Sequence, residues 1–362
     1  MIFDFSKNIA LESLSSETAF EEKVMRFLEE WFSAAKTVSV QTSGSTGKPK
    51  IFHIEKERML HSAKMTCDFL NLNHGDSALL CLPVEYISGK MMIVRSIERK
   101  LKLHVVNPTS KPLENLNAPF DFCAMSPLQV ENSLDKIQLI KNLIIGGAQV
   151  SENLKKEIEK SCLSVKNRVF ETYGMSETLS HIALKEIFPT AEDYFTILDD
   201  VEISKDERGC LTISAPKLNP QILKTNDLVE FKNQKQFRFL GRIDHVINSG
   251  GLKIYPEELE RLVKQQISNE TIFIGIKNES LGEKLILIIE GTENPEVIDQ
   301  LSLVKYPSKN HRPKETIFIE NFPRTPNGKI DRLALKKKFD LPQTYSSKDI
   351  TPNEGNSPYS KS

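Results

Sequence analysis

The strongest constraint on the fold is the alternation of strand-like and helix-like segments between residues 77 and 160. Apolar runs typical of buried strands occupy residues 77–82, 103–106, 120–125 and 142–145, and residues 153–160 have a helical pattern. This alternation predicts a layered α/β domain with a parallel sheet, because crossover helices must cover its faces. Upstream, apolar residues at helical spacing from Phe20 to Phe32 predict an amphipathic helix, opened by a Thr18/Glu21 capping box.

A second, smaller unit begins near Asp244, where the pattern changes. A helix is expected at 256–266, strands at 271–276, 284–290 and 315–320, and a basic helix after them. A chain of 362 residues also exceeds what one hydrophobic core usually supports. We therefore predict a large α/β domain at 1–243, a small mobile α+β domain at 244–340, and a disordered tail rich in Ser, Pro, Asn and Lys at 341–362.

Composition excludes several classes of function. With 48 Lys and Arg against 49 Asp and Glu, the net charge of -1 gives no electrostatic case for binding nucleic acid or an acidic membrane. No apolar run approaches the ~20 residues of a membrane span, and the first residues lack signal-peptide features, so we expect a cytoplasmic protein without membrane insertion. Five cysteines without C-x-x-C spacing predict reduced thiols. The oligomeric state stays open.

Residues 42–50, TSGSTGKPK, combine hydroxyls, two glycines and two lysines. Glycines let the backbone approach a ligand closely, and hydroxyls and lysines add donors and charge, so this segment is a candidate polyphosphate loop. It is not a Walker A loop, because only two residues separate Gly44 from Gly47 and proline follows Lys48. Taken alone, it could equally be a turn before the strand-like residues 50–54.

Five further motifs follow in a fixed order: ETYGMSET at 171–178, TND at 225–227, GRID at 241–244, SGG at 249–251 with IYPEELE at 254–260, and PRTPNGKID at 323–331. With the loop at 42–50, the set resembles the adenylate-forming superfamily of acyl-CoA synthetases, luciferases and peptide-synthetase adenylation domains. The resemblance implies an acid–thiol ligase that couples a small-molecule acid to ATP as an acyl-adenylate, and then transfers the acyl group to CoA. It implies Mg²⁺ as cofactor, with ATP and CoA as co-substrates.

The resemblance also assigns nucleotide-binding residues, which are Thr42, Ser43, Gly44, Ser45, Thr46, Gly47, Lys48, Tyr173, Gly174, Asp227 and Arg242. Tyr173 would lie against adenine, Asp227 would accept the ribose hydroxyls, and Arg242 would reach ribose or phosphate. Relatives usually carry glycine where Asn226 stands, and asparagine tolerates a left-handed backbone, so we expect a turn there. Without the order and spacing of these motifs, Asp227 and Arg242 would be interpreted as solvent-exposed charges.

Three residues receive catalytic roles from the resemblance. Glu177 would hold Mg²⁺, Ser176 would bond to phosphate, and Lys329 would bridge the carboxylate and the α-phosphate during adenylation. Rotation of the small domain about Asp244 would then withdraw Lys329. It would bring Ser249, Gly250 and Gly251 to the site, where small residues can line a channel for the pantetheine thiol.

The acid would contact Ser88, Gly89, Gly146, Gly147, Ala148 and Ser180. The segments 82–89, 143–148 and 173–184 look most like the o-succinylbenzoate–CoA ligases of menaquinone biosynthesis, although Tyr86 stands where those enzymes usually have histidine. About 40 residues precede the phosphate loop, where most relatives have a hundred or more, so we expect the large domain to be N-terminally shortened. Another acyl- or aryl-CoA ligase and a carrier-loading adenylation module are the alternatives.

Overall fold

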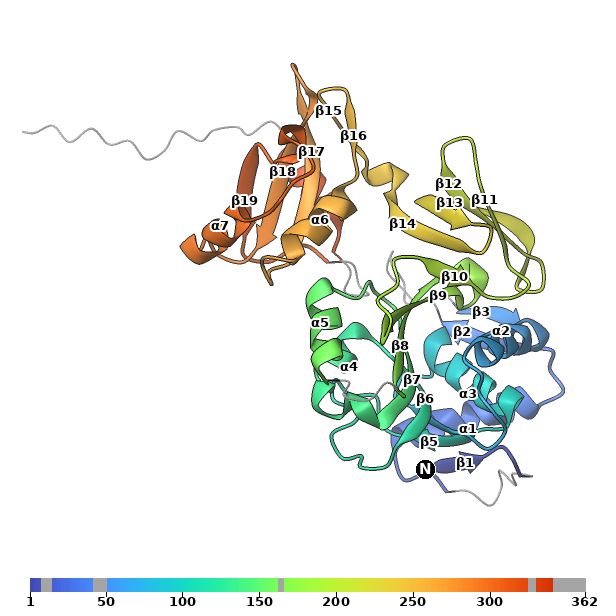
Figure 1. Cartoon of the computed structure of the whole chain (residues 1–362). Helices are drawn as coiled ribbons and strands as arrows, with labels where there is room; N and C mark the ends of the chain where they lie inside the picture. The colour runs from blue at the N-terminus through green and yellow to red at the C-terminus, as the bar shows by residue number, and fades with distance from the viewer. Residues whose placement is uncertain (8–14, 42–50, 162–165, 325–329, 341–362) are drawn as a thin grey trace, which may run out of the picture.

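A computed structural model describes residues 1–7, 15–41, 51–161, 166–324 and 330–340 (Figure 1). Its main feature is a twelve-stranded sheet. In spatial order the strands are β1 (Ile2–Asp4), β5 (Lys102–Val105), β4 (Ser77–Leu80), β6 (Phe120–Met125), β7 (Ile140–Ile145), β8 (Arg168–Gly174), β9 (His181–Phe188), β10 (Phe195–Ile197), β14 (Gln236–Arg242), β13 (Asn219–Asn233), β12 (Cys210–Ala215) and β11 (Glu202–Lys205). The expected α/β fold is confirmed, and the strand-like runs form β4 to β7.

Helices cover both faces of the parallel part of this sheet. Across the described ranges the α-helices are α1 (Ala19–Phe32), α2 (Lys56–Phe69), α3 (Ile87–Arg99), α4 (Pro127–Glu131), α5 (Glu152–Ser161), α6 (Pro256–Lys264), α7 (Pro295–Ser302) and α8 (Arg332–Asp340). Leu80 packs with α1, α2 and α3, whereas its neighbour Leu79 packs with α4 and α5, because successive strand residues point to opposite faces. Thr18 and Glu21 form the predicted capping box of α1.

The sheet is parallel only in part, so the sequence-based expectation of a parallel sheet was wrong beyond β8. Strands β5, β4, β6, β7 and β8 run parallel, joined by α3, by α4 with the 3₁₀ helix η2 (Leu134–Leu139), and by α5. From β8 onward neighbouring strands are antiparallel. Except for β10 and β14, these neighbouring strands are consecutive in the chain, and strands joined by short connections pair antiparallel because a parallel pair needs a long crossover.

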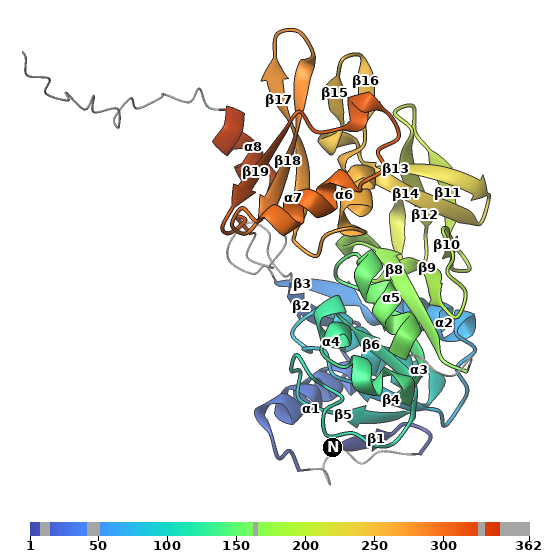
Figure 2. The ribbon, with the colours of Figure 1, turned by 60° about the vertical axis from the view of Figure 1, so that its left-hand side comes forward.

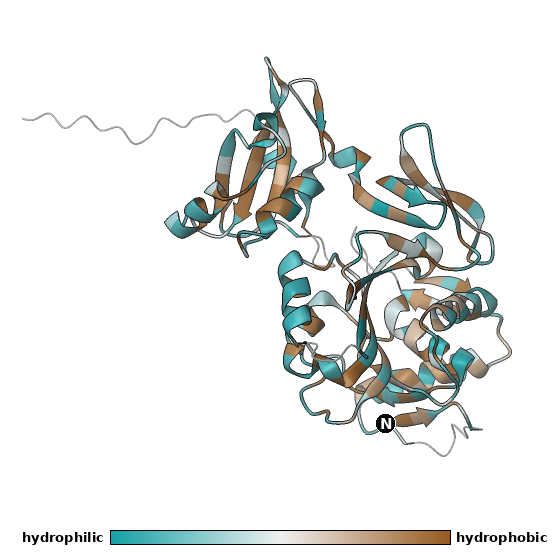
Figure 3. Cartoon of the chain, in the orientation of Figure 1, coloured by the Kyte–Doolittle hydropathy of each residue, from teal (hydrophilic) through white to brown (hydrophobic). Residues whose placement is uncertain are grey.

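A second sheet, of five strands, begins after β14. It contains β15 (Ile247–Ser249), β16 (Leu252–Ile254), β17 (Thr271–Asn278), β18 (Gly282–Glu290) and β19 (Glu315–Ile319). One face packs on α6 and α7 and the other on α8. Figures 1 and 2 both show these elements above β8 and α5. In Figure 3 brown hydrophobic residues line β17 and β18, while α5 is largely teal.

Several expectations fall on residues outside the described ranges. These are the phosphate loop at 42–50, Lys329 and the tail at 341–362. The chain on either side of the loop is described: β2 (Thr37–Gln41) pairs antiparallel with β3 (Ile51–Glu55), and Gln41 faces Ile51. Cys67, Cys81, Cys123 and Cys210 are buried free thiols, as predicted. Within the described ranges, no helix is long and apolar enough to cross a membrane.

Candidate active site

A cavity of about 960 Å³ lies where four parallel strands end. Leu82 follows β4, Ser126 follows β6, Gly146 follows β7, and Thr172 to Ser176 form and follow the end of β8. In α/β sheets the carboxyl ends of parallel strands are the usual place for ligands, because the loops that follow them converge there. The cavity therefore sits where the fold itself favours a binding site.

Nine of the predicted site residues line this cavity: Ser88, Gly146, Gly147, Ala148, Tyr173, Gly174, Ser176, Ser180 and Asp227. They come from α3, the β7–α5 loop, β8, the β8–β9 connection and β13. The predicted residues Gly89, Glu177, Arg242, Asp244, Ser249, Gly250 and Gly251 do not belong to its lining. Three residues expected for the nucleotide, Tyr173, Gly174 and Asp227, thus share one cavity with five of the six expected for the acid, although they are far apart in sequence.

Glu177 and Ser176 lie in a short 3₁₀ helix, η3 (Ser176–Thr178), at the edge of the cavity. The Glu177 side chain is exposed, and among the described residues its carboxylate has no ion pair, while its backbone carbonyl accepts from Asn219 Nδ2 at 3.0 Å. Mg²⁺ prefers one or two carboxylates together with phosphate oxygens, so a free carboxylate at this edge fits a nucleotide-bound Mg²⁺. The described residues contain no cluster of three or more acidic, His or Cys side chains that could hold a metal alone.

Tyr173 and Asp227 contact one another inside the cavity. The Tyr173 hydroxyl donates to Asp227 Oδ2, and the ring packs against Phe237 with centroids 5.0 Å apart. Burial and the nearby Asp227 carboxylate raise the pKa of Tyr173 far above its ordinary value, so its hydroxyl keeps its proton and donates. Tyr173 therefore holds Asp227 in place on β13.

Arg242 and Asp244 form a forked ion pair at the end of β14. Arg242 Nε and Nη2 lie 3.0 and 2.9 Å from the two Asp244 carboxylate oxygens, and Arg242 Nη1 lies 3.8 Å from Asp227 Oδ1. The left-handed turn expected at Asn226 is wrong: Asn226 lies inside β13, with Asp227 opposite Arg242, and its φ is not positive. Asp227 and Arg242 form the terminal pair of the β13–β14 ladder, and Asn226 lies just beyond this pair within β13.

Two glycines at the cavity are explained by close backbone approach. A Cβ on Gly174 would lie 2.5 Å from His181 Cα and 2.5 Å from the Ser180 carbonyl oxygen, because β8 and β9 converge there. A Cβ on Gly146 would lie 2.7 Å from Thr172 Oγ1. Gly89 has a packing reason too, since a Cβ there would lie 2.3 Å from the Pro83 carbonyl oxygen, where α3 meets the preceding loop.

Arg95 is a cavity residue that the sequence reasoning missed. It lies on α3, is only 2% exposed, and lines the cavity. Nη2 donates to Ser180 Oγ at 2.8 Å, whereas the buried Nε has no hydrogen-bond partner among the described residues. Burial lowers the pKa of Arg95 to about 10, which still leaves the guanidinium charged at neutral pH. The available signal was a lone arginine inside the apolar run from Met91 to Ile97.

A lysine–glutamate pair in the cavity was also missed. Lys185 Nζ lies 2.8 Å from Glu171 Oε2, and Lys155 Nζ lies 3.9 Å from the same oxygen. Glu171 is 4% exposed, and its other oxygen accepts from the Val150 backbone amide at 3.1 Å. This buried pair ties β8 to β9 and to the start of α5, so it fixes the wall of the cavity.

The predicted CoA-channel residues lie at the tip of the β15–β16 hairpin. Ser249 pairs with Leu252, and Gly250 and Gly251 have φ of 57° and 79°. Positive φ at both central residues of a two-residue hairpin turn favours glycine, so the turn alone accounts for this pair. Asp244 lies in the 3₁₀ helix η4 (Ile243–His245), in the segment between the two sheets.

The small unit contributes one helix to the cavity. Glu257, Glu258 and Arg261 of α6 belong to the lining. Glu257 Oε1 lies 2.5 Å from His245 Nδ1, and the Glu257 carboxylate occupies the space in which a Cβ on Gly241 would lie. Helix α6 therefore closes one side of the cavity in this arrangement.

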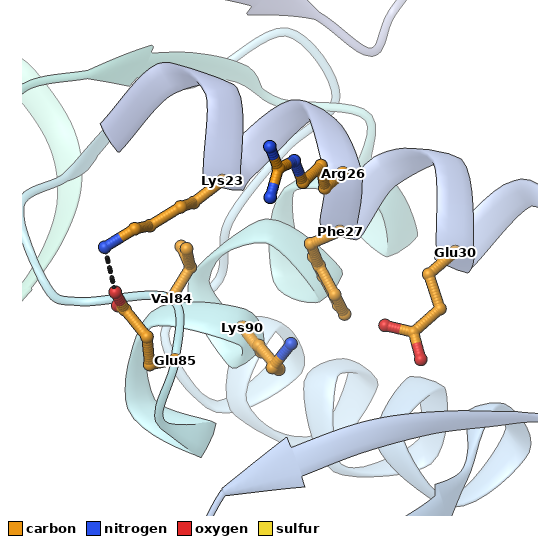
Figure 4. A pocket seen from close by; sticks show the side chains of 7 residues that line it. All are labelled: Lys23, Arg26, Phe27, Glu30, Val84, Glu85 and Lys90. Atoms are coloured by element: carbon orange, nitrogen blue, oxygen red, sulfur yellow. Dashed lines mark hydrogen bonds and ion pairs between the residues drawn. The ribbon is translucent and has the colours of Figure 1, made fainter. Parts of the chain in front are cut away.

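A smaller hollow of about 190 Å³ lies between α1 and the start of α3 (Figure 4). Its cations are largely matched by acids: Lys23 Nζ lies 2.5 Å from Glu85 Oε1, and Glu30 also lines the hollow. Lys90 Nζ stands 4.3 Å from the centroid of the Phe27 ring. This hollow contains none of the predicted site residues, so the larger cavity is the candidate active site.

Comparison with known proteins agrees with the geometry of the cavity. A family model described as AMP-binding enzyme matches residues 38–230, which is more than half of the chain. The chain belongs to the AMP-binding enzyme family. The match contains the cavity-lining parts of α3, β7, β8 and β13. The chain is also similar to a protein of known structure, an acyl-CoA synthetase (AMP-forming)/AMP-acid ligase II-like protein from Dyadobacter fermentans. The two are 34% identical, with a TM-score of 0.63 and coverage of 94% of this chain and 100% of that one.

Named relatives in the AMP-binding enzyme family include 2-succinylbenzoate–CoA ligases. The protein from Listeria monocytogenes is 26% identical over 89% of this chain and 74% of its own length. That from Lactococcus lactis is 24% identical over 92% of this chain and 81% of its own length. The structure of o-succinylbenzoate CoA synthetase from Bacillus subtilis, in complex with ATP and magnesium, has the same fold, with a TM-score of 0.67 at 20% identity over 83% of this chain and 69% of that chain.

Proposed function

We propose that this protein is an AMP-forming acid–CoA ligase whose acid is o-succinylbenzoate. It would use ATP to form o-succinylbenzoyl-adenylate with release of pyrophosphate, and then form o-succinylbenzoyl-CoA with release of AMP. Membership of the AMP-binding enzyme family supports the type of reaction. The names of the relatives that match about nine tenths of the chain support the choice of acid.

The observation that carries the choice of acid is the buried Arg95. A guanidinium removed from water costs several kcal/mol unless an anion compensates it. Ser180 is its hydrogen-bond partner in the cavity, and the described residues supply no carboxylate to pair with it. An acid with two carboxylates would place one at the reacting phosphate and the other against Arg95. A fatty acid would leave the arginine unpaired.

The other cavity residues fit the nucleotide. Asp227 would accept ribose hydroxyls, with Tyr173 holding it, and Ser176 would donate to phosphate. Gly146 and Gly147 would let the acyl-adenylate approach the end of β7 closely. Glu177 would hold Mg²⁺, which when bound neutralises charge on the phosphates. These roles rest on the cavity geometry together with the family motifs.

The proposed reaction has two steps. First, a carboxylate oxygen of the acid attacks the α-phosphorus of ATP, and the bond to the β-phosphate oxygen breaks, so pyrophosphate leaves. Then the sulfur of CoA attacks the acyl carbonyl carbon, the bond to AMP breaks, and the thiol proton passes to solvent. Lys329 would stabilise the first transition state, because a nearby cation offsets the charge that develops on the phosphate.

Pyrophosphate release across a panel of acids, with and without CoA, tests this proposal. We expect o-succinylbenzoate to give rapid release and a CoA thioester in equal amount, and medium-chain fatty acids to give little of either. Adenylate formation without transfer to CoA would favour a carrier-loading module. Faster turnover of benzoate or a fatty acid would favour another acyl-CoA ligase.

A further inference from the structure

A chain of polar contacts runs from Arg95 along the wall of the cavity and ends at a buried threonine on α2. Arg95 Nη2 donates to Ser180 Oγ at 2.8 Å. Ser180 Oγ lies 3.5 Å from His181 Nδ1, and His181 Nε2 lies 3.0 Å from Thr66 Oγ1. Thr66 Oγ1 in turn lies 3.1 Å from the Ser62 carbonyl oxygen. The chain therefore links α3, the start of β9 and α2; Arg95, Ser180 and His181 line the cavity, and Thr66 lies outside its lining.

The positions of the protons follow from the chemistry of each group. A carbonyl can only accept, so the single Thr66 proton goes to Ser62, and Thr66 must accept from His181 Nε2–H. A neutral imidazole with its proton on Nε2 leaves Nδ1 as an acceptor. Ser180 accepts from Arg95 and can donate its own proton to Nδ1. One assignment thus satisfies the contacts between Arg95 Nη2, Ser180, His181 and Thr66, and only Arg95 Nε is left without a partner among the described residues.

The surroundings of His181 agree with a neutral ring. His181 is 7% exposed, and burial followed by the charge of Arg95 places its pKa well below the ordinary range. A protonated ring would put a second positive charge behind Arg95 and would remove the Nδ1 acceptor. The neutral tautomer is therefore the one that lets Ser180 bond to both neighbours.

We propose that Thr66, His181 and Ser180 act as a positioning chain that holds the Arg95 guanidinium toward the cavity, with the His181 proton on Nε2. This inference rests on the proposed function, in which Arg95 binds the second carboxylate of the acid. Ser180, expected from sequence to contact the acid, would act through Arg95 instead. Thr66, which does not line the cavity, would set specificity without touching substrate, and His181, which does line it, would act on Arg95 through Ser180.

The local backbone supports a fixed position for Ser180. Leu179 has φ of 65° and ψ of -48°, and the Ser180 amide donates to the Thr178 carbonyl oxygen at 2.8 Å, which makes a tight γ-turn. Gly174 packs directly beneath Ser180 and His181. Arginine has many rotamers, so fixing one of them before substrate binds lowers the entropy that binding must lose.

The test compares acids that differ by one carboxylate. We would measure kcat/KM for o-succinylbenzoate and for its monocarboxylic analogues 4-oxo-4-phenylbutanoate and 2-butanoylbenzoate, and express specificity as the ratio. His181→Phe keeps a ring but removes both nitrogens, and Thr66→Val removes the hydroxyl at nearly constant volume. Each variant should lower the ratio of kcat/KM for o-succinylbenzoate to kcat/KM for the analogues about tenfold or more, because the contact between Arg95 and the second carboxylate is weakened. The KM for ATP should stay unchanged.

Two further variants separate positioning from general damage. His181→Asn places an amide group near Nδ1 but cannot reach Thr66, so it should regain only part of the specificity that His181→Phe loses and resemble Thr66→Val. Met65→Leu, a buried volume-conserving change beside Thr66 on α2, should leave the ratio as in the wild type. An unchanged ratio in folded His181→Phe and Thr66→Val would overturn the positioning chain.

Nitrogen NMR of the wild-type protein tests the tautomer without any loss of fold. We expect His181, assigned by its absence in His181→Asn, to show the Nε2–H form with no titration between pH 6 and 8. A protonated ring or the Nδ1–H form would overturn the proposal. If the wild-type enzyme itself did not prefer o-succinylbenzoate over both analogues, the proposed function would fail first, whatever the tautomer.

Discussion

Arg95 shows what single residues contribute to this cavity. Its charge is buried on the apolar face of α3, and its hydrogen-bond partner in the cavity, Ser180, lies 85 positions away in the chain. Periodicity along α3 can mark the arginine as unusual, but it cannot say which distant residue it meets. Ser88, Tyr173 and Asp227 were predictable because each has a fixed position within a sequence motif of the family. All three line the cavity.

Replacement of Arg95 by methionine should weaken binding of the acid and spare the nucleotide. The KM for o-succinylbenzoate should rise by a factor that corresponds to ~1.5–3 kcal/mol, the usual value for a hydrogen bond to a charged group. Steady-state kinetics with o-succinylbenzoate and ATP varied in turn measure this. The fold should survive, because removal of a buried charge without a counter-ion relieves a desolvation cost. An unchanged KM for the acid would show that Arg95 does not bind it.

Glu177→Gln should raise the Mg²⁺ concentration needed for half-maximal activity. The amide keeps the size of the side chain but loses the charge that attracts the cation. A Mg²⁺ titration at saturating ATP and acid gives the comparison, and Glu186→Gln, on β9 and paired with Arg168, is the matched control. If both variants needed the same Mg²⁺ as the wild type, the metal ligand would be another residue.

Elements with strong periodicity were predicted well, whereas their pairing was not. The runs expected at 120–125 and 271–276 form β6 (Phe120–Met125) and β17 (Thr271–Asn278), and the helix expected at 256–266 is α6 (Pro256–Lys264). The antiparallel half of the large sheet was missed, because direction and order of strands depend on contacts between segments rather than on their own pattern. Strand β14, for example, pairs with β10 on one side and β13 on the other.

The β8–β9 connection gives a prediction at this scale. Gly174→Ala should destabilise the protein by ~1–3 kcal/mol, because the added Cβ would lie 2.5 Å from His181 Cα and the backbone must shift. Thermal or urea unfolding measures the loss. Ser176→Ala, two residues further along at an exposed position, should change stability by less than ~0.5 kcal/mol. Equal stability of the two variants would mean that the strands tolerate the extra atom.

At the scale of the whole molecule, residues 243–246 connect the last-numbered strand of the large sheet, β14, to β15 of the second sheet. The domain boundary predicted at residue 244 lies within this connecting segment. The structure presents one arrangement, with Glu257 and Arg261 of α6 at the cavity. In it the β15–β16 hairpin, with Gly250 and Gly251, is not part of the cavity lining. The proposed second state requires rotation of the small unit, and a sequence pattern cannot give the relative placement of two units.

Lys329→Ala should separate the two half-reactions. Formation of the acyl-adenylate should fall by ~10²–10³, as for loss of one well-placed transition-state contact, while thioester formation from supplied acyl-adenylate should be largely kept. Pyrophosphate release and CoA consumption measure the two steps. Asp244→Pro should show the opposite pattern, because proline restricts φ where rotation needs backbone freedom. Equal loss in both steps for either variant would contradict the two-state scheme.

The proposed product of this cavity is o-succinylbenzoyl-CoA. The most direct measurement gives the wild-type protein ATP, Mg²⁺ and CoA with an equimolar mixture of o-succinylbenzoate, 4-oxo-4-phenylbutanoate, benzoate and decanoate, and follows each CoA thioester by mass spectrometry. A buried cation that is left unpaired strongly disfavours an acid that lacks its partner. We therefore predict that o-succinylbenzoyl-CoA forms first and dominates the early products. Predominance of benzoyl-CoA or decanoyl-CoA would contradict the account.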